Sequence, residues 1–211
     1  SIYRTRQQTQ DEIRAKLNMV KRTNVNKFVK YEKDDVLIGF EKMVEKYKPD
    51  LIAMTLVDDT IPMGLALLDR VKKYHIKTVV GGVGVIFGYK RLLTYDTIDF
   101  ACIGEGENAL VELCQRMSKG EDCTAIQNLY TKGKDGKIIK NKMKRLVDLN
   151  TLPLPDFSIF KDFRFYRPFH GEVVRMAPID TDRGCPYVCT YCAASSLREM
   201  FKKETGDNYL R

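Results

Sequence analysis

The sequence has few of the features that would place it in a membrane or outside the cell. None of its apolar runs approaches the length of about 18 residues that a membrane-spanning helix needs. The polar, basic stretch that begins at Ser1 contains no hydrophobic core of a signal peptide. We therefore expect a soluble, cytoplasmic protein in which thiols stay reduced.

Histidine is scarce, which limits the metal sites that the chain can build. Only His75 and His170 are present. His75 follows an amphipathic segment near its C-terminal end, where partial positive charge is favoured, and we expect it at the surface. His170 precedes a cysteine-rich segment and is therefore a candidate metal ligand.

Acidic residues are outnumbered by basic ones, and the net charge is +8. Much of the excess lies in residues 131–148, which hold seven lysine and arginine residues and two aspartates. The sequence Lys134-Asp135-Gly136-Lys137 in this stretch is typical of a hairpin turn. A solvated basic hairpin is the simpler interpretation, and the distribution argues against a nucleic-acid site.

Hydrophobic residues make up 44% of the 211 residues, enough for a packed core. Short apolar runs alternate with amphipathic segments, which predicts an α/β fold with a Rossmann-like parallel sheet. We expect strands at residues 51–56, 77–80 and 98–103, and helices at residues 35–47, 61–74 and 108–117, with a short helical piece at 90–93. A further helix is expected at residues 11–20.

Ligands of such sheets bind beyond the carboxyl ends of the strands. The ends fall at residues 57–60, 81–84 and 104–107. The last of these resembles a dinucleotide fingerprint in form, but its two glutamates would face the pyrophosphate, so ordinary turn glycines are the simpler interpretation. Asp58 and Asp59 either form a polar wall for a ligand or belong to a helix start, with Thr60 the better capping residue.

The chain divides into four expected regions. Two prolines at residues 153 and 155 make a stiff connector, at which we place a domain boundary. The regions are an N-terminal polar and helical segment at 1–33, a Rossmann-like domain at 34–148 with the basic hairpin at 124–148, a linker at 149–172 and the start of a second domain at 173–211.

The six cysteines fall into two groups. Three are scattered, at positions 102, 114 and 123. The others, Cys185, Cys189 and Cys192, lie on one loop between an expected strand at 173–182 and an expected helix at 196–205. A reduced cluster of this kind indicates a metal site, either structural zinc with a fourth ligand from elsewhere or an iron–sulfur cluster. Three thiolates on a [4Fe–4S] cluster would leave one iron open.

The spacing Cys185-x-x-x-Cys189-x-x-Cys192, with Tyr191 before the last cysteine, resembles the cluster motif of the radical S-adenosylmethionine superfamily. The flanking Arg183-Gly184-Cys185-Pro186 resembles the form found in members with an N-terminal cobalamin-binding domain. The upstream strand ends and the connector at 149–155 occur in the order found in that branch. The resemblance covers about residues 35–200.

The resemblance implies the cofactors and the residues that hold them. Cys185, Cys189 and Cys192 would bind three irons of a [4Fe–4S] cluster, the fourth iron would bind S-adenosylmethionine, and Tyr191 would contact the adenine. Electron transfer would then release a 5′-deoxyadenosyl radical. The residues implied as cobalamin contacts are Thr55, Val57, Asp58, Gly81, Gly82, Gly104, Glu105 and Gly106.

The implied enzyme would methylate or cyclise a small-molecule or natural-product-type substrate, with flavodoxin or ferredoxin as electron donor. The Asp-x-His-x-x-Gly motif that supplies a lower-face histidine to cobalt in some cobalamin domains is absent. Only 19 residues follow Cys192, too few for a partial (β/α) barrel, so we expect a fragment that is truncated at both ends and inactive by itself.

Two alternatives remain open. A tRNA methylthiotransferase of the radical superfamily is suggested by the basic charge, although the three scattered cysteines are not arranged for a second cluster. A non-enzymatic α/β binding module with a structural metal loop is the other.

Overall fold

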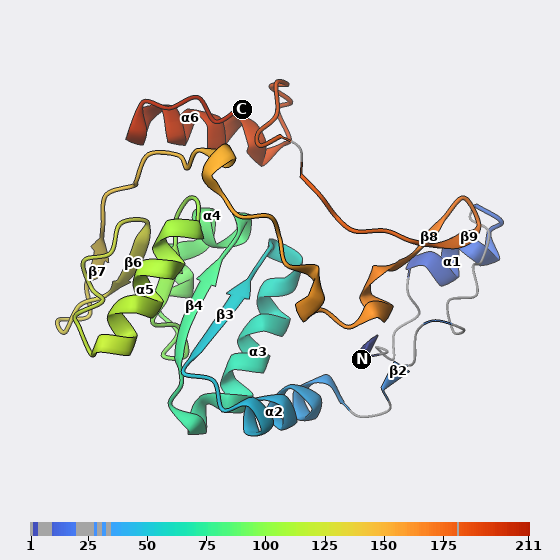
Figure 1. Ribbon diagram of the computed structural model, residues 1–211, viewed down its shortest axis with the longest axis horizontal. Coiled ribbons are helices and arrows are strands. Elements are labelled where there is room, and N and C mark those ends of the chain that lie inside the picture. Colours follow the sequence, from blue (N-terminus) through green and yellow to red (C-terminus); the bar gives the residue numbers. More distant parts are fainter. Residues whose placement is uncertain (1, 4–9, 20–27, 29–30, 33–34, 181) are drawn as a thin grey trace. The chain divides into compact units, whose positions relative to one another are not determined.

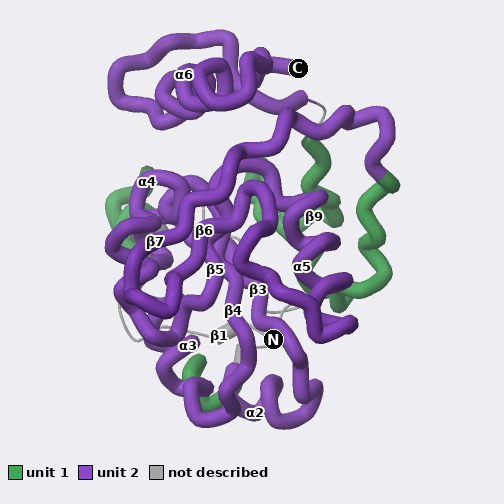
Figure 2. Tube along the Cα trace, turned by 90° about the vertical axis from the view of Figure 1, so that its left-hand side faces the viewer, with its two compact units in different colours: residues 1–39, 153–181 green, residues 40–152, 182–211 purple. Residues whose placement is uncertain are grey.

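The computed structural model describes all residues except 1, 4–9, 20–27, 29–30, 33–34 and 181 (Figure 1). The chain divides into two compact units, coloured in Figure 2. One unit comprises residues 1–39 and 153–181, and the other comprises residues 40–152 and 182–211. The second unit therefore combines the predicted α/β domain with the cysteine-rich segment.

The larger unit is built around a five-stranded sheet with the order β3-β4-β5-β6-β7. The strands are β3 (Leu51–Thr55), β4 (Lys77–Gly81), β5 (Phe100–Cys102), β6 (Leu129–Lys132) and β7 (Ile138–Lys140). The first three are parallel, with Thr55 opposite Gly81 and Val80 opposite Ala101, and the last two are antiparallel. The sequence-predicted α/β fold with a largely parallel sheet is confirmed.

Two helices connect the parallel strands, as the alternating pattern predicts (Figure 1). α3 (Ile61–Val71) connects β3 to β4, and α4 (Val83–Leu92) connects β4 to β5. The other helices are α2 (Val36–Tyr47) before β3, α5 (Glu107–Lys119) after β5 and α6 (Ala193–Thr205) after the cysteine-rich segment, with short 3-10 turns at Asp58–Thr60, Lys72–Tyr74 and Leu149–Thr151. In the described part of the chain, none of the helices is both long and apolar enough to cross a membrane.

The two faces of the sheet bury different hydrophobic clusters because successive strand residues point to opposite sides. On one face, Ile52, Val80 and Ala101 pack with residues of α3 and α4. On the other, Phe100 and Cys102 pack with Leu113 of α5 and its neighbours. This second face is open over part of β3, where Ala53 is exposed.

The expected elements differ from the observed ones in three places. The glycine-rich stretch after β4 was expected to be a loop before a short helical piece at 90–93, but α4 already begins at Val83. The strand expected at 173–182 is only Glu172–Arg175, in an antiparallel hairpin. The helix expected at 196–205 begins three residues earlier, at Ala193.

The basic segment forms the expected hairpin, and it also extends the sheet. β6 and β7 pair in antiparallel fashion, and β6 pairs with β5. In the turn, the Gly133 N–H donates to the Lys137 carbonyl at 2.8 Å. Lys134, Lys137 and Lys140 are thus exposed in the turn and in the edge strand β7.

The smaller unit contains short elements only. They are β1 (Ile2–Tyr3), α1 (Gln10–Lys16), β2 (Tyr31–Glu32), β8 (Tyr166–Phe169), β9 (Glu172–Arg175) and 3-10 turns at Phe157–Ile159 and Asp162–Phe165. α1 ends at Lys16, short of the expected residue 20, which lies outside the described residues. Phe165 is buried, with Phe157 and Phe160 packed edge-on against it.

Candidate functional site

A pocket of about 450 Å³ lies at the carboxyl ends of the three parallel strands. We call it the edge pocket. Its volume lies in the range of small-molecule sites, and its position is the one at which parallel sheets bind ligands. Its lining comprises Ala53, Met54, Thr55, Val79, Gly81, Gly82, Cys102, Gly104, Gly106, Glu107, Leu110 and Leu129.

The two glycines that follow β4, Gly82 and Gly84, are required by close backbone contacts. Gly82 has a φ of 100°, and a Cβ there would lie 2.7 Å from the carbonyl oxygen of Leu56. A Cβ at Gly84 would lie 3.0 Å from the Asp58 nitrogen. Only glycine lets the start of α4 approach the end of β3 this closely, so α4 can begin immediately after the strand.

Cys102 and Glu107 add chemistry to an otherwise apolar and glycine-lined pocket. Burial, and then the Glu107 carboxylate, raise the pKa of the Cys102 thiol to about 11. Cys102 therefore stays a neutral thiol at pH 7. Glu107 Oε2 is buried, and no described residue donates a hydrogen bond to it. The pocket thus offers an unused carboxylate oxygen as an acceptor.

The cysteine loop, which we define as residues 184–192, is closed at its base. The Arg183 N–H donates to the Arg211 carbonyl at 2.8 Å, and the Arg211 N–H donates to the Arg183 carbonyl at 2.9 Å. Within the loop, Gly184 has a φ of 98°, and the Cys192 N–H donates to the Cys189 carbonyl at 3.2 Å. Cys192 is also the N-cap residue of α6.

The two arginines at this base converge on one carboxylate of the sheet edge. Glu105 accepts hydrogen bonds from Arg183 Nη1 at 2.8 Å, Arg211 Nη2 at 2.5 Å and the Val147 N–H at 2.8 Å. Arg183 Nη2 donates to Glu107 at 2.5 Å. We call these four side chains, Glu105, Glu107, Arg183 and Arg211, the carboxylate–arginine latch.

Charge compensation in the latch outweighs the effect of burial. Burial raises the pKa of the Glu105 carboxyl, but the hydrogen bonds from Arg211, the Val147 N–H and Arg183 lower it further, so the pKa lies below its ordinary value. Burial lowers the pKa of Arg183, but Glu107 and Glu105 raise it above its ordinary value. Both partners are therefore ionised over the whole neutral range.

Helix α6 holds the other side of the cysteine loop to the sheet. Phe201 is buried, stacks on Tyr209 with ring centroids 4.7 Å apart, and lies beside Gly104 of the edge pocket loop. Asp207 accepts from Arg145 at 2.8 Å and from the Leu146 N–H at 2.9 Å. Apolar packing and ion pairs together fix the cysteine-bearing segment against the carboxyl edge.

The sequence-predicted cobalamin contacts are brought together only in part. The pocket includes Thr55, Gly81, Gly82, Gly104 and Gly106. Val57 and Asp58 lie exposed at the 3-10 turn after β3, and Glu105 points its carboxylate into the latch instead. The assignment of all eight as cobalamin contacts stays a prediction. The reasoning from sequence missed Cys102 as a lining residue, although its place at the end of an apolar strand was a usable signal.

The expected capping role of Thr60 takes a different form. Thr60 is the N-cap residue of α3, but its hydroxyl makes no bond to that helix. It accepts from the Val57 N–H at 2.9 Å and donates to the Val57 carbonyl at 3.0 Å. Asp58 and Asp59 are exposed in the same turn.

The cysteines of the loop are present as free thiols, with Cys185 half-buried and Cys189 and Cys192 exposed. Among the described residues, no three side chains of histidine, cysteine, aspartate or glutamate are gathered as they would be around a metal ion. Tyr191 is 90% exposed and its ring is available to a ligand. The assignment of these four residues to cluster and S-adenosylmethionine stays a prediction.

The remaining histidines and cysteines occupy separate places. His75 is exposed and ends the turn after α3, as expected for a surface histidine. His170 is exposed at the β8–β9 turn. Cys114 is exposed on α5 and Cys123 is half-buried after it, whereas Cys102 is in the sheet. In the part of the chain that the structure describes, these three cysteines form no metal-binding group.

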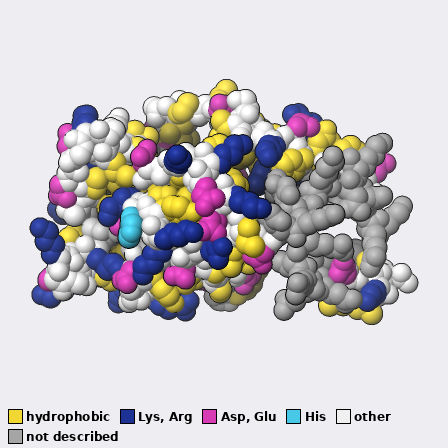
Figure 3. All heavy atoms as spheres, turned by 90° about the horizontal axis from the view of Figure 1, so that it is seen from below, with side chains coloured by type: hydrophobic (Ala, Val, Ile, Leu, Met, Phe, Trp, Pro, Cys, Tyr) yellow, Lys and Arg dark blue, Asp and Glu magenta, His cyan; other side chains and the backbone are white. Residues whose placement is uncertain are grey.

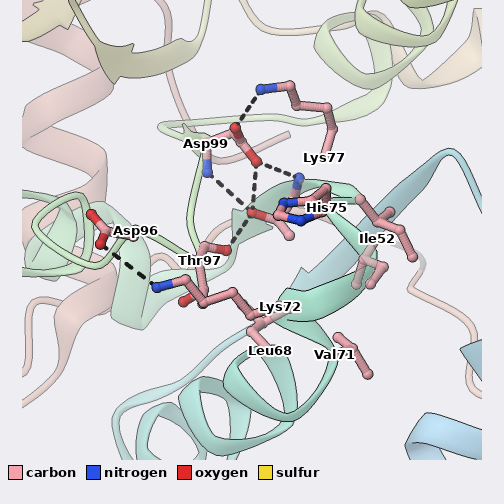
Figure 4. A pocket seen from close by; sticks show the side chains of 11 residues that line it. Ile52, Leu68, Val71, Lys72, His75, Lys77, Asp96, Thr97 and Asp99 are labelled. Carbon is pink, nitrogen blue, oxygen red and sulfur yellow. Dashed lines mark hydrogen bonds and ion pairs between the residues drawn. The ribbon is translucent and has the colours of Figure 1, made fainter.

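A second pocket, of about 220 Å³, lies at the opposite, amino-terminal end of the parallel strands (Figure 4). Its polar side chains are engaged with one another. Asp99 accepts from Lys77 Nζ at 2.7 Å and from the Thr78 N–H at 2.9 Å, and Thr78 Oγ1 donates to the Thr97 carbonyl at 2.6 Å. This network joins β4 to the start of β5, and we interpret it as a structural contact of the sheet.

Charge on the face seen in Figure 3 is mixed, with acidic side chains between the lysines and arginines. Several basic side chains of the larger unit are paired, such as Arg70 and Lys73 with the buried Glu41. This arrangement agrees with a solvated basic surface and gives no support to a nucleic-acid site.

Comparison with known families decides what the α/β unit is. Residues 27–114 match the B12 binding domain family. This part of the chain is therefore similar to B12-binding domains. The match covers the parallel strands, the glycine loops and most of α5, and hence nearly all of the edge pocket.

Two curated proteins and one solved structure extend the likeness beyond that domain. An uncharacterized methyltransferase of Pyrococcus horikoshii is 25% identical over 158 residues, which is 73% of this chain and 33% of that protein. The anaerobic magnesium-protoporphyrin IX monomethyl ester cyclase of Cereibacter sphaeroides is 26% identical over 167 residues, 74% of this chain and 26% of that protein. The chain thus spans about a third or less of the curated relatives that it matches.

The solved structure of the cobalamin-dependent S-adenosylmethionine radical enzyme OxsB, with aqua-cobalamin and S-adenosylmethionine bound, has the same fold. The TM-score is 0.60 at 20% identity, over 74% of this chain and 22% of that one. This likeness shows the fold, and with the match to the B12 binding domain family it agrees with the predicted resemblance to the cobalamin-binding branch of the radical S-adenosylmethionine superfamily.

Proposed function

We propose that the chain is the cobalamin-binding and cluster-binding part of a radical S-adenosylmethionine enzyme that methylates or cyclises an organic small molecule. The observation that carries the proposal is the juxtaposition of two sites in one unit. The edge pocket of a B12-binding domain and the cysteine loop meet at the carboxylate–arginine latch. A chain built to bring two cofactors to one substrate requires such a junction.

The edge pocket has the properties that a corrin ligand requires. Four glycines, Gly81, Gly82, Gly104 and Gly106, leave its walls without side chains, so a large ligand can approach the backbone. The apolar lining supplies contact area, and Glu107 Oε2 supplies an acceptor to which no described residue donates. The corrin ring carries carboxamide groups at its periphery, whose N–H groups suit such an acceptor.

The donor set of the cysteine loop suits an iron–sulfur cluster in kind. Cys185, Cys189 and Cys192 are three unpaired thiols on one loop, and two of them are exposed. We assign one iron to each and the adenine of S-adenosylmethionine to Tyr191. When bound, such a cluster supplies one-electron cleavage of S-adenosylmethionine to a 5′-deoxyadenosyl radical, and cobalamin supplies a methyl carrier.

The chain's own contribution is to hold and orient these groups. Glu105 and Arg183 fix the base of the loop at the mouth of the pocket. Burial keeps the Cys102 thiol protonated, so Cys102 contributes a neutral wall instead of a thiolate. Electron donors of the flavodoxin or ferredoxin type and a natural-product-type substrate complete the proposal.

Anaerobic reconstitution tests the cluster assignment. We expect four irons per chain and the visible absorption of a [4Fe–4S] cluster, both lost in Cys189→Ala and retained in the matched control Cys114→Ala. A cluster that survives Cys189→Ala would overturn the ligand assignment. Stoichiometric zinc without iron would favour a non-enzymatic module with a structural metal loop, and about eight irons would favour a methylthiotransferase with a second cluster.

Titration with aquacobalamin tests the pocket. We expect one corrin per chain, detected by its visible absorption after gel filtration. Gly81→Leu places a side chain in the pocket and should abolish binding. Gly120→Leu should leave binding unchanged, because Gly120 lies at the end of α5 and a Cβ there would meet no atom within 4 Å. Equal binding by both variants would move cobalamin out of this pocket.

A further inference from the structure

We propose that Glu107 couples occupancy of the edge pocket to the position of the cysteine loop, acting through its ion pair with Arg183. The proposal deepens the cobalamin-binding function proposed above and rests on it. Glu107 is a positioning residue here, because its side chain lines the ligand pocket and one of its oxygens holds the cysteine-bearing segment.

The two carboxylate oxygens of Glu107 have different surroundings. One, Oε1, accepts from Arg183 Nη2 at 2.5 Å. The other, Oε2, is buried and receives no hydrogen bond from any described residue. The Glu107 side chain lines the edge pocket, beside Gly106 and Leu110. Since buried acceptors are almost always satisfied, the unused oxygen points to a ligand group that donates a hydrogen bond.

The two glutamates of the latch are held to different degrees. The Glu105 side chain is 12% exposed and takes donors from Arg183, Arg211 and Val147. The Glu107 side chain is 33% exposed and accepts from Arg183. Glu105 is therefore held in one position, whereas a ligand can change the orientation of the Glu107 side chain.

Arg183 transmits this orientation to the cysteines. Its guanidinium spans both carboxylates, Nη1 to Glu105 and Nη2 to Glu107. Its backbone pairs with Arg211 and lies two residues before Cys185. A ligand group that donates a hydrogen bond to Glu107 Oε2 would therefore hold both hydrogen bonds of the Arg183 guanidinium in place, and with them the start of the cysteine loop. By linkage, a loop that is in place must strengthen ligand binding by the same factor.

Affinity for aquacobalamin, measured by absorbance titration in the apo chain, tests the coupling without any turnover. We expect Arg183→Gln and Glu107→Gln each to weaken binding about tenfold, within the usual range of such couplings. The double variant should bind no more weakly than Glu107→Gln alone, because Arg183 does not line the edge pocket and influences it through Glu107. Arg183→Lys should also stay weak, because an ammonium cannot span two carboxylates as a guanidinium fork does.

The matched control is Arg116→Gln. Arg116 also pairs with a carboxylate, Glu112, but both residues belong to helix α5 and neither lines the edge pocket. The affinity of this variant for aquacobalamin should stay within about twofold of wild type.

Hydrogen exchange of residues 183–192 gives a second readout, and its main measurement is made on the wild-type chain. We expect aquacobalamin to slow exchange there at least about fivefold in the wild-type chain and not in Glu107→Gln. Wild-type binding without this protection, or fully additive effects of Arg183→Gln and Glu107→Gln, would overturn the coupling and leave the proposed function standing. A wild-type chain that binds no cobalamin would overturn the proposed function, and the coupling with it.

Discussion

Removal of the negative charge at Glu105 should destabilise the larger unit far more than removal of the charge of a glutamate that is paired at the surface. Glu105 is 12% exposed and accepts from Arg183, Arg211 and the Val147 N–H. In Glu105→Gln the volume is kept, but only one oxygen remains to accept, and the new amide group would face a donor.

The expected loss follows from the degree of burial. Removing one partner from a fully buried ion pair costs about 3–5 kcal/mol. The arginine side chains are 28% and 22% exposed, and Arg183 retains Glu107, so the low end applies. We expect the free energy of unfolding of Glu105→Gln to fall by about 3 kcal/mol at pH 7.

Glu112→Gln is the matched control. Glu112 also pairs with an arginine, Arg116, at 2.6 Å, but within one helix and with both side chains about a third exposed. Its removal should cost about 0.5 kcal/mol or less. Urea denaturation of the two variants and the wild type, followed by circular dichroism, measures both losses. A Glu105→Gln loss within about 0.5 kcal/mol of the Glu112→Gln loss would refute the reasoning.

The pH dependence supplies an independent check of the same prediction. The pKa of the Glu105 carboxyl is depressed in the folded chain, so its contribution is fully present above the unfolded value of about 4.3 and is lost as the pH falls through the folded value. The difference in stability between wild type and Glu105→Gln should therefore shrink below about pH 4. A difference that is constant from pH 7 to pH 3 would mean that charge is not its source.

Three further predictions concern the same unit, and urea denaturation checks the first two. Gly82→Ala should lower the free energy of unfolding by at least about 3 kcal/mol, because the residue has a φ of 100° and its Cβ would meet a backbone oxygen at 2.7 Å. Its control is Gly120→Ala, which has a φ of 67° and open space around the Cβ and should lower the free energy of unfolding by about 1 kcal/mol. Thr78→Val should cost about 2 kcal/mol, because the hydroxyl donates to a carbonyl at 2.6 Å and accepts from an N–H at 3.0 Å, while Thr78→Ser should keep most of that stability. The pKa of the Cys102 thiol is raised to about 11, so Cys102 should react with a thiol reagent at pH 8 at least about tenfold more slowly than the exposed Cys114. Mass spectrometry of the labelled chain measures both rates, and equal rates would contradict the burial of Cys102.

Much of the fold could be predicted from the sequence because its signals are local. The strands β3, β4 and β5 are short apolar runs, and the apolar residues of α5 recur at helical spacing. The composition and the spacing of apolar residues were therefore sufficient to predict these elements. α4 was missed because its first residues include glycine, which ordinarily marks a loop. Its early start depends on the close approach of Gly82 and Gly84 to the end of β3, and that is a tertiary contact.

The cysteine motif and the glycine loops of the candidate site could be recognised in the sequence. The side-chain contacts that join them could not. The motif around Cys185 is a local pattern, whereas Arg183 and Glu105 are 78 residues apart in the sequence. Nothing in the spacing of either residue indicates its partner. The strand expected at 173–182 was wrong beyond residue 175 because alternating apolar residues there pair only within a short hairpin.

The latch also explains why the glycine loop after β5 does not suit a nucleotide. In a dinucleotide site the helix N-terminus binds the pyrophosphate, which two carboxylates would repel. Here both carboxylates remain, and their charge is matched from within the chain by Arg183 and Arg211. Glu107 lines the pocket and has one carboxylate oxygen to which no described residue donates, so the loop favours a ligand with N–H donors over a phosphate. The residues that argue against a nucleotide are thus the ones that would tie the proposed carboxamide-bearing cofactor to the cysteine loop.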